Sequence, residues 1–125
     1  MSEDRKRIAI VDDDRGVLRA LGRLVQALGY DATGYGSGEE LLADLGQRAP
    51  ACAILDYHLQ GLSGFEILKV LSRATPPVAA VVVTGFDEPG LFDRCLAAGA
   101  VACVLKPVSQ IAIEAALAKA TCPRD

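Results

Sequence analysis

Aromatic residues are scarce in this chain of 125 residues, which has no tryptophan, three tyrosines and three phenylalanines. Hydrophobic residues nevertheless make up 51% of the sequence. The core therefore has to be built from valine, leucine, isoleucine and alanine, a composition typical of helices packed on both faces of a parallel sheet. A chain of this length suits one domain and leaves no room for a second.

The chain also lacks a strong charge of either sign, because its formal net charge is −3. Its basic cluster Arg5-Lys6-Arg7 is too short for a nucleic-acid surface, so we expect no direct nucleic-acid binding. The first seven residues contain no apolar core of a signal peptide, and no later segment is long enough to span a bilayer. These absences favour a soluble, cytoplasmic protein.

The four cysteines lack the close spacing of a zinc site or a thioredoxin-like centre. Cys52 and Cys103 lie within apolar runs, where a small buried hydrophobic side chain is the favoured interpretation. Cys95 and Cys122 could be more exposed. All four are interpreted as reduced thiols.

Short apolar runs alternate with amphipathic stretches from end to end, which predicts five strands alternating with five helices in one α/β unit. The strand-like runs are residues 8–11, 30–35, 51–55, 78–83 and 101–105. The run at 78–83 has no polar face and should be central in the sheet, whereas the more polar run at 30–35 fits an edge.

Polar residues at the starts of the predicted helices match known capping patterns. Asp14 is expected to cap the first helix and Ser109 the fifth. Ser37 and Glu40 have the form of a capping box, in which each side chain would accept a hydrogen bond from the backbone amide of the other residue.

Four of the strand-like runs end in polar residues. These are Asp12-Asp13-Asp14, Asp56, Thr84-Gly85 and Lys106-Pro107. In a parallel sheet these ends lie along one edge, where open α/β sheets bind ligands. Several carboxylates, a hydroxyl and an ammonium gathered in one cleft favour phosphoryl chemistry.

Each of these side chains has a physical role in such chemistry. Asp56 can accept a phosphoryl group as an acyl phosphate. A divalent cation, most plausibly Mg²⁺, would relieve the charge repulsion, and Asp12 and Asp13 are placed to hold it directly or through water. Lys106 would pair with Asp56 and later with a phosphoryl oxygen, and the Thr84 hydroxyl would hydrogen-bond another.

In this order and at these strand ends, the residues resemble the receiver domain of two-component response regulators. Ser63-Gly64, in the turn after Asp56, adds to the resemblance. It implies a doubly wound, five-stranded parallel sheet of order 2-1-3-4-5 with five helices. The domain would span residues 5–121, with short tails at 1–4 and 122–125.

The resemblance further implies that a sensor histidine kinase or a phosphotransfer protein phosphorylates Asp56. Mg²⁺ would be bound by Asp12, Asp13 and Asp56 and by the backbone carbonyl of His58. Pro107 resembles the family's cis-proline, which would aim Lys106 inward. A downstream protein target or an output domain outside this chain would receive the signal, and a phosphorylation-dependent dimer is possible.

Two positions depart from the family pattern. Cys103, three residues before Lys106, stands where the family usually carries the tyrosine or phenylalanine of its switch. Any switching would then rely on the loop Thr84-Gly85-Phe86 moving as a unit. In the turn after Asp56, Gln60 replaces the family's common proline, so that loop could be less stiff.

Two other functions compete with this interpretation. Asp12-Asp13-Asp14 also fits the Asp-x-Asp motif of haloacid-dehalogenase-type phosphatases, but Asp56 would then have no role and no acidic pair follows Lys106. The second alternative is a receiver-like module that works without phosphate, and the presence of Cys103 is compatible with it. Neither displaces the expectation of a switch that catalyses only its own phosphorylation and dephosphorylation and is not a turnover enzyme.

Overall fold

The computed structural model describes residues 5–85 and 88–121, and within them five strands alternate with five helices. The strands are β1 (Arg7–Val11), β2 (Asp31–Tyr35), β3 (Cys52–Asp56), β4 (Ala79–Thr84) and β5 (Ala102–Leu105). The helices are α1 (Arg15–Ala27), α2 (Gly38–Leu45), α3 (Gly64–Arg73), α4 (Leu91–Ala97) and α5 (Gln110–Ala120). No helix in these two stretches is both long and apolar enough to cross a membrane.

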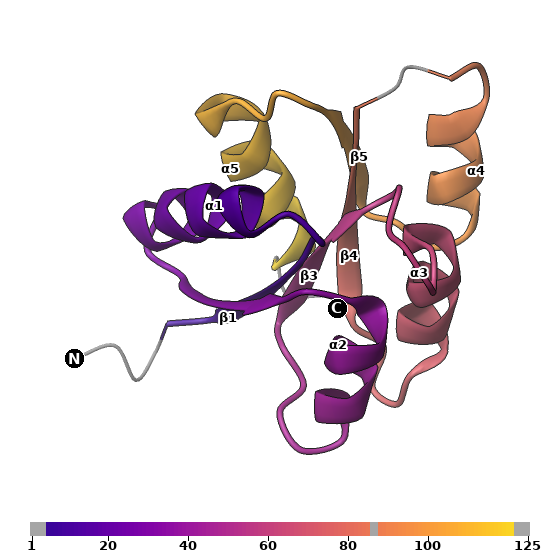
Figure 1. Ribbon diagram of the computed structural model, residues 1–125, viewed down its shortest axis with the longest axis horizontal. Coiled ribbons are helices and arrows are strands. Elements are labelled where there is room, and N and C mark those ends of the chain that lie inside the picture. The colour runs from indigo at the N-terminus through magenta and orange to yellow at the C-terminus, as the bar shows by residue number, and fades with distance from the viewer. Residues whose placement is uncertain (1–4, 86–87, 122–125) are drawn as a thin grey trace.

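The five strands form one parallel sheet of order β2-β1-β3-β4-β5, which confirms the predicted fold. Helices α1 and α5 cover one face, and α2, α3 and α4 cover the other (Figure 1). Each face has its own apolar cluster, with Ile54 and Val81 on the α1/α5 side and Leu55 and Val82 on the opposite side. Aliphatic side chains dominate both clusters, as the shortage of aromatics requires.

The strand register brings the polar strand ends to one edge of the sheet. Val11 lies opposite Leu55, and Asp56 lies opposite Val83. Thr84, the last residue of β4, is paired with Leu105. The residues that follow β1, β3, β4 and β5 are therefore neighbours, as the sequence predicts.

The predicted caps are present, with one difference. Asp14 accepts hydrogen bonds from the first-turn amides of α1, and Ser109 accepts from the Ala112 amide. Ser37 accepts from the Glu40 amide, but the Glu40 carboxylate accepts from the amide of Gly36, at 3.4 Å, rather than from that of Ser37. The box predicted for α2 is therefore only half formed in its expected pairing.

The cysteines differ in part from the expectation. Cys52 is buried as predicted, but Cys95 is also fully buried because it lies on the face of α4 that packs against the sheet. Cys103 is only partly buried, since β5 is an edge strand. Cys122 lies outside the described residues.

Candidate functional site at the carboxyl edge of the sheet

Asp56 ends β3 and is nearly buried, with 7% of its surface exposed. Its Oδ1 accepts a hydrogen bond from the His58 amide at 3.1 Å. Its Oδ2 lies 3.5 Å from Nζ of Lys106. One carboxylate oxygen is therefore fixed by the loop that follows β3, and the other faces a cation.

Asp12 follows β1 and lies beside Asp56, almost completely buried. Its Oδ1 accepts from the Asp14 amide at 2.9 Å, and its Oδ2 lies 3.3 Å from Nζ of Lys106. Burial raises the pKa of Asp12, and the nearby charge of Asp56 raises it further, although the Asp14 amide and Lys106 act in the opposite direction. The repulsion between the Asp56 and Asp12 carboxylates contributes to this shift, but burial is the larger cause.

Lys106 follows β5 and reaches both carboxylates, whereas the sequence predicted a pairing with Asp56 alone. Its backbone amide donates to the Thr84 carbonyl at 2.8 Å, which aligns the end of β5 with that of β4. Burial alone would lower the pKa of Lys106, but the carboxylates of Asp56 and Asp12 raise it above its usual value. The peptide bond between Lys106 and Pro107 is cis, as the resemblance implied.

Asp13 completes a cluster of three carboxylates, because oxygen atoms of Asp12, Asp13 and Asp56 lie within 4.8 Å of one another. Asp13 is exposed, and its Oδ2 accepts a weak hydrogen bond from the Gln60 amide at 3.4 Å. Because a proline has no amide hydrogen, this link between the β1 and β3 ends depends on Gln60. A donor set of carboxylate oxygens suits a hard cation such as Mg²⁺ better than a thiophilic metal.

Thr84 is fully buried at the end of β4, and Gly85 follows it on the surface. Gly85 and Lys106 border a groove of about 550 Å³ that runs beside α1. A Cβ added at Gly85 would meet no atom within 4 Å. The site is therefore open on this side. Phe86, which the sequence analysis named as part of the switch, lies outside the described residues.

Three features of the site were missed in the sequence. Ser63 and Glu66 form a complete capping box at the start of α3, although the same Ser-x-x-Glu signal that was noted at Ser37 is present there. At Gly64, a Cβ would lie only 2.4 Å from the backbone oxygen of Asp56. His58 Nε2 lies 3.8 Å from Oε1 of Glu88 and so links the loops after β3 and β4.

Comparison with known proteins gives a consistent result. The sequence matches the profile of the response regulator receiver domain over residues 8–118. It is 31% identical over 107 residues to the response regulator protein TmoT of Ectopseudomonas mendocina, covering 86% of this chain and 49% of that protein. It is 29% identical over 110 residues to the transcriptional regulatory protein FixJ of Azorhizobium caulinodans, covering 88% of this chain and 52% of that protein.

A solved structure is also similar. The crystal structure of a CheY-like response regulator receiver domain protein from Methanospirillum hungatei superimposes with a TM-score of 0.82 at 28% identity, covering 90% of each chain. The chain thus spans about half the length of the curated relatives it matches, but covers 90% of the Methanospirillum hungatei chain.

Proposed function

Since the chain belongs to the response regulator receiver domain family of two-component systems, we propose that Asp56 is its phosphoryl acceptor. The observation that carries the proposal is the juxtaposition of three carboxylates, within 4.8 Å of one another, with the Lys106 ammonium 3.5 Å from Asp56. The family is not one of catalytic enzymes, so the phosphatase alternative is set aside. Residues 5–121 would form the receiver domain.

In the proposed reaction, a carboxylate oxygen of Asp56 attacks the phosphorus of a phosphohistidine on a partner kinase or phosphotransfer protein. The new P–O bond forms as the P–N bond breaks, and the electron pair of that bond returns to the imidazole nitrogen. The His58 amide holds the carboxylate in place. Lys106, which already lies beside Asp56, would form an ion pair with one phosphoryl oxygen, and the Thr84 hydroxyl would donate a hydrogen bond to another.

The family generally uses Mg²⁺, and the carboxylate cluster fits that ion. We assign Asp12, Asp13, Asp56 and the backbone carbonyl of His58 as its ligands. When bound, the ion offsets the negative charge that these carboxylates and the phosphoryl group bring together.

The signal would pass from Asp56 to the loop that begins with Gly85 and then to α4. Cys103 lacks the ring that the family usually places there, so movement of the loop and of α4 would carry the change. The recipients would be a downstream protein target, an output domain or a second copy of this domain, in the cytoplasm where a histidine kinase presents its phosphate. Amide shifts across Glu88 to Leu96 should therefore change on forming the beryllofluoride adduct, whereas those of α3 should change little.

The direct test is phosphorylation by acetyl phosphate, which needs no partner protein. With Mg²⁺, intact-mass measurement should show a gain of about 80 Da, one phosphoryl group, and chelation by EDTA should abolish it. Asp56→Asn should not be labelled. Asp14→Asn is the matched control, because Asp14 belongs to the same acidic run but caps α1 instead of joining the cluster. Equal labelling of Asp56→Asn and the wild type would refute the assignment.

The ion site has a separate test. Mg²⁺ in excess should raise the melting temperature of the wild type, as any ligand of the native state does. Asp13→Ala should lose most of that response, because it removes one of the three carboxylates of the cluster. Asp13 is the exposed member of the cluster, so this change should disturb the fold least. An undiminished response in Asp13→Ala would place the ion elsewhere.

A further inference from the structure

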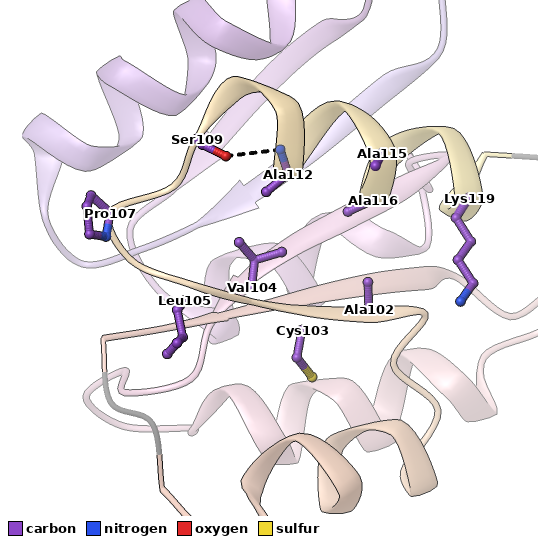
Figure 2. A pocket seen from close by; sticks show the side chains of 10 residues that line it. All are labelled: Ala102, Cys103, Val104, Leu105, Pro107, Ser109, Ala112, Ala115, Ala116 and Lys119. Carbon is purple, nitrogen blue, oxygen red and sulfur yellow. Dashed lines mark hydrogen bonds between the residues drawn. The ribbon is translucent and has the colours of Figure 1, made fainter.

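Two cysteines meet between α4 and β5, on the sheet face opposite α1 and α5. Figure 2 shows the side chain of Cys103 pointing away from α5 and toward α4. Its thiol donates a weak hydrogen bond to the Phe92 carbonyl of α4, with 3.9 Å between sulfur and oxygen. Cys95 lies about one turn further along that helix and is fully buried, and its thiol interacts with that of Cys103.

We propose that Cys95 and Cys103 form a dithiol site that oxidises to an intramolecular disulfide linking α4 to β5. Cys95 belongs to the apolar cluster on this face of the sheet, and Cys103 packs against the same cluster. Cys52 belongs to the cluster on the other face of the sheet and has no part in this pair. The inference does not depend on phosphorylation of Asp56.

Access to the pair is one-sided. Cys103 is partly exposed on the edge strand β5, with its sulfur on the side of the strand away from the groove between β5 and α5 that Figure 2 draws. Cys95 is closed off beneath α4. An oxidant would therefore meet Cys103 first, and Cys95 would be the resolving thiol.

The oxidant that we assign is a small-molecule disulfide such as oxidised glutathione. The Cys103 thiolate attacks one of its sulfurs, forming a mixed disulfide and releasing one glutathione thiol. Cys95 then attacks the Cys103 sulfur and releases the second. The protein loses two electrons and two protons, and the two glutathione molecules take up all of them. The S–S bond of oxidised glutathione is broken, and one between Cys95 and Cys103 is formed.

Burial sets the rate of this exchange. It raises the pKa of the Cys103 thiol to about 12 and also raises that of Cys95. Because the thiolate is the attacking species, the pair should stay reduced for long periods near neutral pH. As long as the pH is below the pKa, each increase of one pH unit should make oxidation about tenfold faster.

The test uses the full chain carrying Cys122→Ser, which removes the thiol outside the described residues. After incubation with oxidised glutathione at pH 8.5, the intact mass should fall by about 2 Da, and peptide mapping should link Cys95 to Cys103. Dithiothreitol should restore the original mass. Cys95→Ser should instead retain one glutathione on Cys103, because it lacks the resolving thiol. Cys52→Ala, the matched control, should form the same disulfide as the parent.

Hydrogen exchange of the oxidised form gives a readout in the folded protein. The amides of α4 should exchange several-fold more slowly than in the reduced form, while those of α2 stay unchanged. The proposal is overturned if the native chain forms no internal disulfide even after an incubation lengthened, relative to that of the urea-unfolded chain, by the factor by which burial lowers its thiolate fraction. A map that pairs Cys52 with either residue, or that links two molecules, overturns it equally.

Discussion

Helices α3 and α4 both follow strands that end at the candidate site, but they begin in opposite ways. The start of α3 is held by the Ser63–Glu66 capping box and by a hydrogen bond from the Gly64 amide to the Tyr57 carbonyl. The start of α4 follows Gly90, which has a φ of 78° and no side chain to cap the helix. Helix α4 has seven residues against ten in α3.

This difference indicates that α3 and α4 have different roles around Asp56: α3 is fixed, and α4 can shift. The loop after β3 places the His58 amide on the Asp56 carboxylate, so the anchoring of α3 keeps the proposed acceptor in one geometry. Helix α4 is retained mainly by the burial of Leu91 and Cys95 in the sheet-facing cluster. An element held by few contacts and no cap is the one that can change position at low cost.

The largest expected effect comes from Gly64→Ala. Its Cβ would lie 2.4 Å from the Asp56 carbonyl oxygen and 2.8 Å from Tyr57 Cα, both backbone atoms that cannot rotate away. We expect a loss of about 3 kcal/mol in the free energy of unfolding, measured by urea titration, together with weaker labelling of Asp56. Gly85→Ala is the control on the open side of the site and should change stability by less than about 0.5 kcal/mol. Similar losses in the two variants would remove the contrast.

A second prediction concerns the charge at the fixed side of the site. Because the pKa of Asp12 is raised in the folded state, the folded protein binds more protons than the unfolded chain between pH 3.8 and that raised value, so stability falls as pH increases through this range. Asp12→Asn removes this loss. In EDTA, its free energy of unfolding relative to the wild type should therefore increase with pH across the window and then level off.

Magnesium provides the control for that variant. The ion should stabilise the wild type at neutral pH and leave Asp12→Asn almost unchanged, because one of the three carboxylates is gone. In EDTA, a stability difference between Asp12→Asn and the wild type that does not vary with pH would show that Asp12 does not cause the pH dependence.

Ser63→Ala should have a smaller effect, since it removes one cap and leaves the packing of α3 intact. Loss of the hydrogen bond from the Glu66 amide should cost about 1 kcal/mol of unfolding free energy. Ser72→Ala is the matched control, because its hydroxyl donates a hydrogen bond to the Lys69 carbonyl within the same helix and caps no helix start. If both changes are neutral, the capping box does not anchor α3.

The sequence predicted the composition of the site because every polar group in it ends an apolar run. The parallel sheet then brings Asp12, Asp56, Thr84 and Lys106 together without further information. Hydrogen bonds made by loop amides were not predictable in this way. The donation from His58 and Gln60 depends on how the loop after β3 turns, which side-chain identity does not specify.

Short helices also limit what periodicity can predict. Leu91, Phe92, Cys95 and Leu96 recur at helical spacing within α4, but only Leu91 and Cys95 of these four are buried, and Leu96 is 47% exposed. Seven residues make about two turns, too few for spacing to define one face. The two Ser-x-x-Glu signals were likewise equivalent in sequence, and only that of α3 forms the full box.

The smallest expected effect concerns the contact between His58 and Glu88, which joins the α3 side of the site to the α4 side. His58 and Glu88 connect the anchored loop after β3 to the loop before α4, with 3.8 Å between Nε2 and Oε1. Both side chains are more than 40% exposed and the pair is ionic only when the imidazole is protonated, so solvent screens it strongly. A double-mutant cycle with His58→Ala and Glu88→Gln should give a coupling energy of at most about 0.5 kcal/mol, measured by urea unfolding. A coupling energy above about 1 kcal/mol would show that this contact anchors the loop before α4 about as strongly as the Ser63 cap anchors α3.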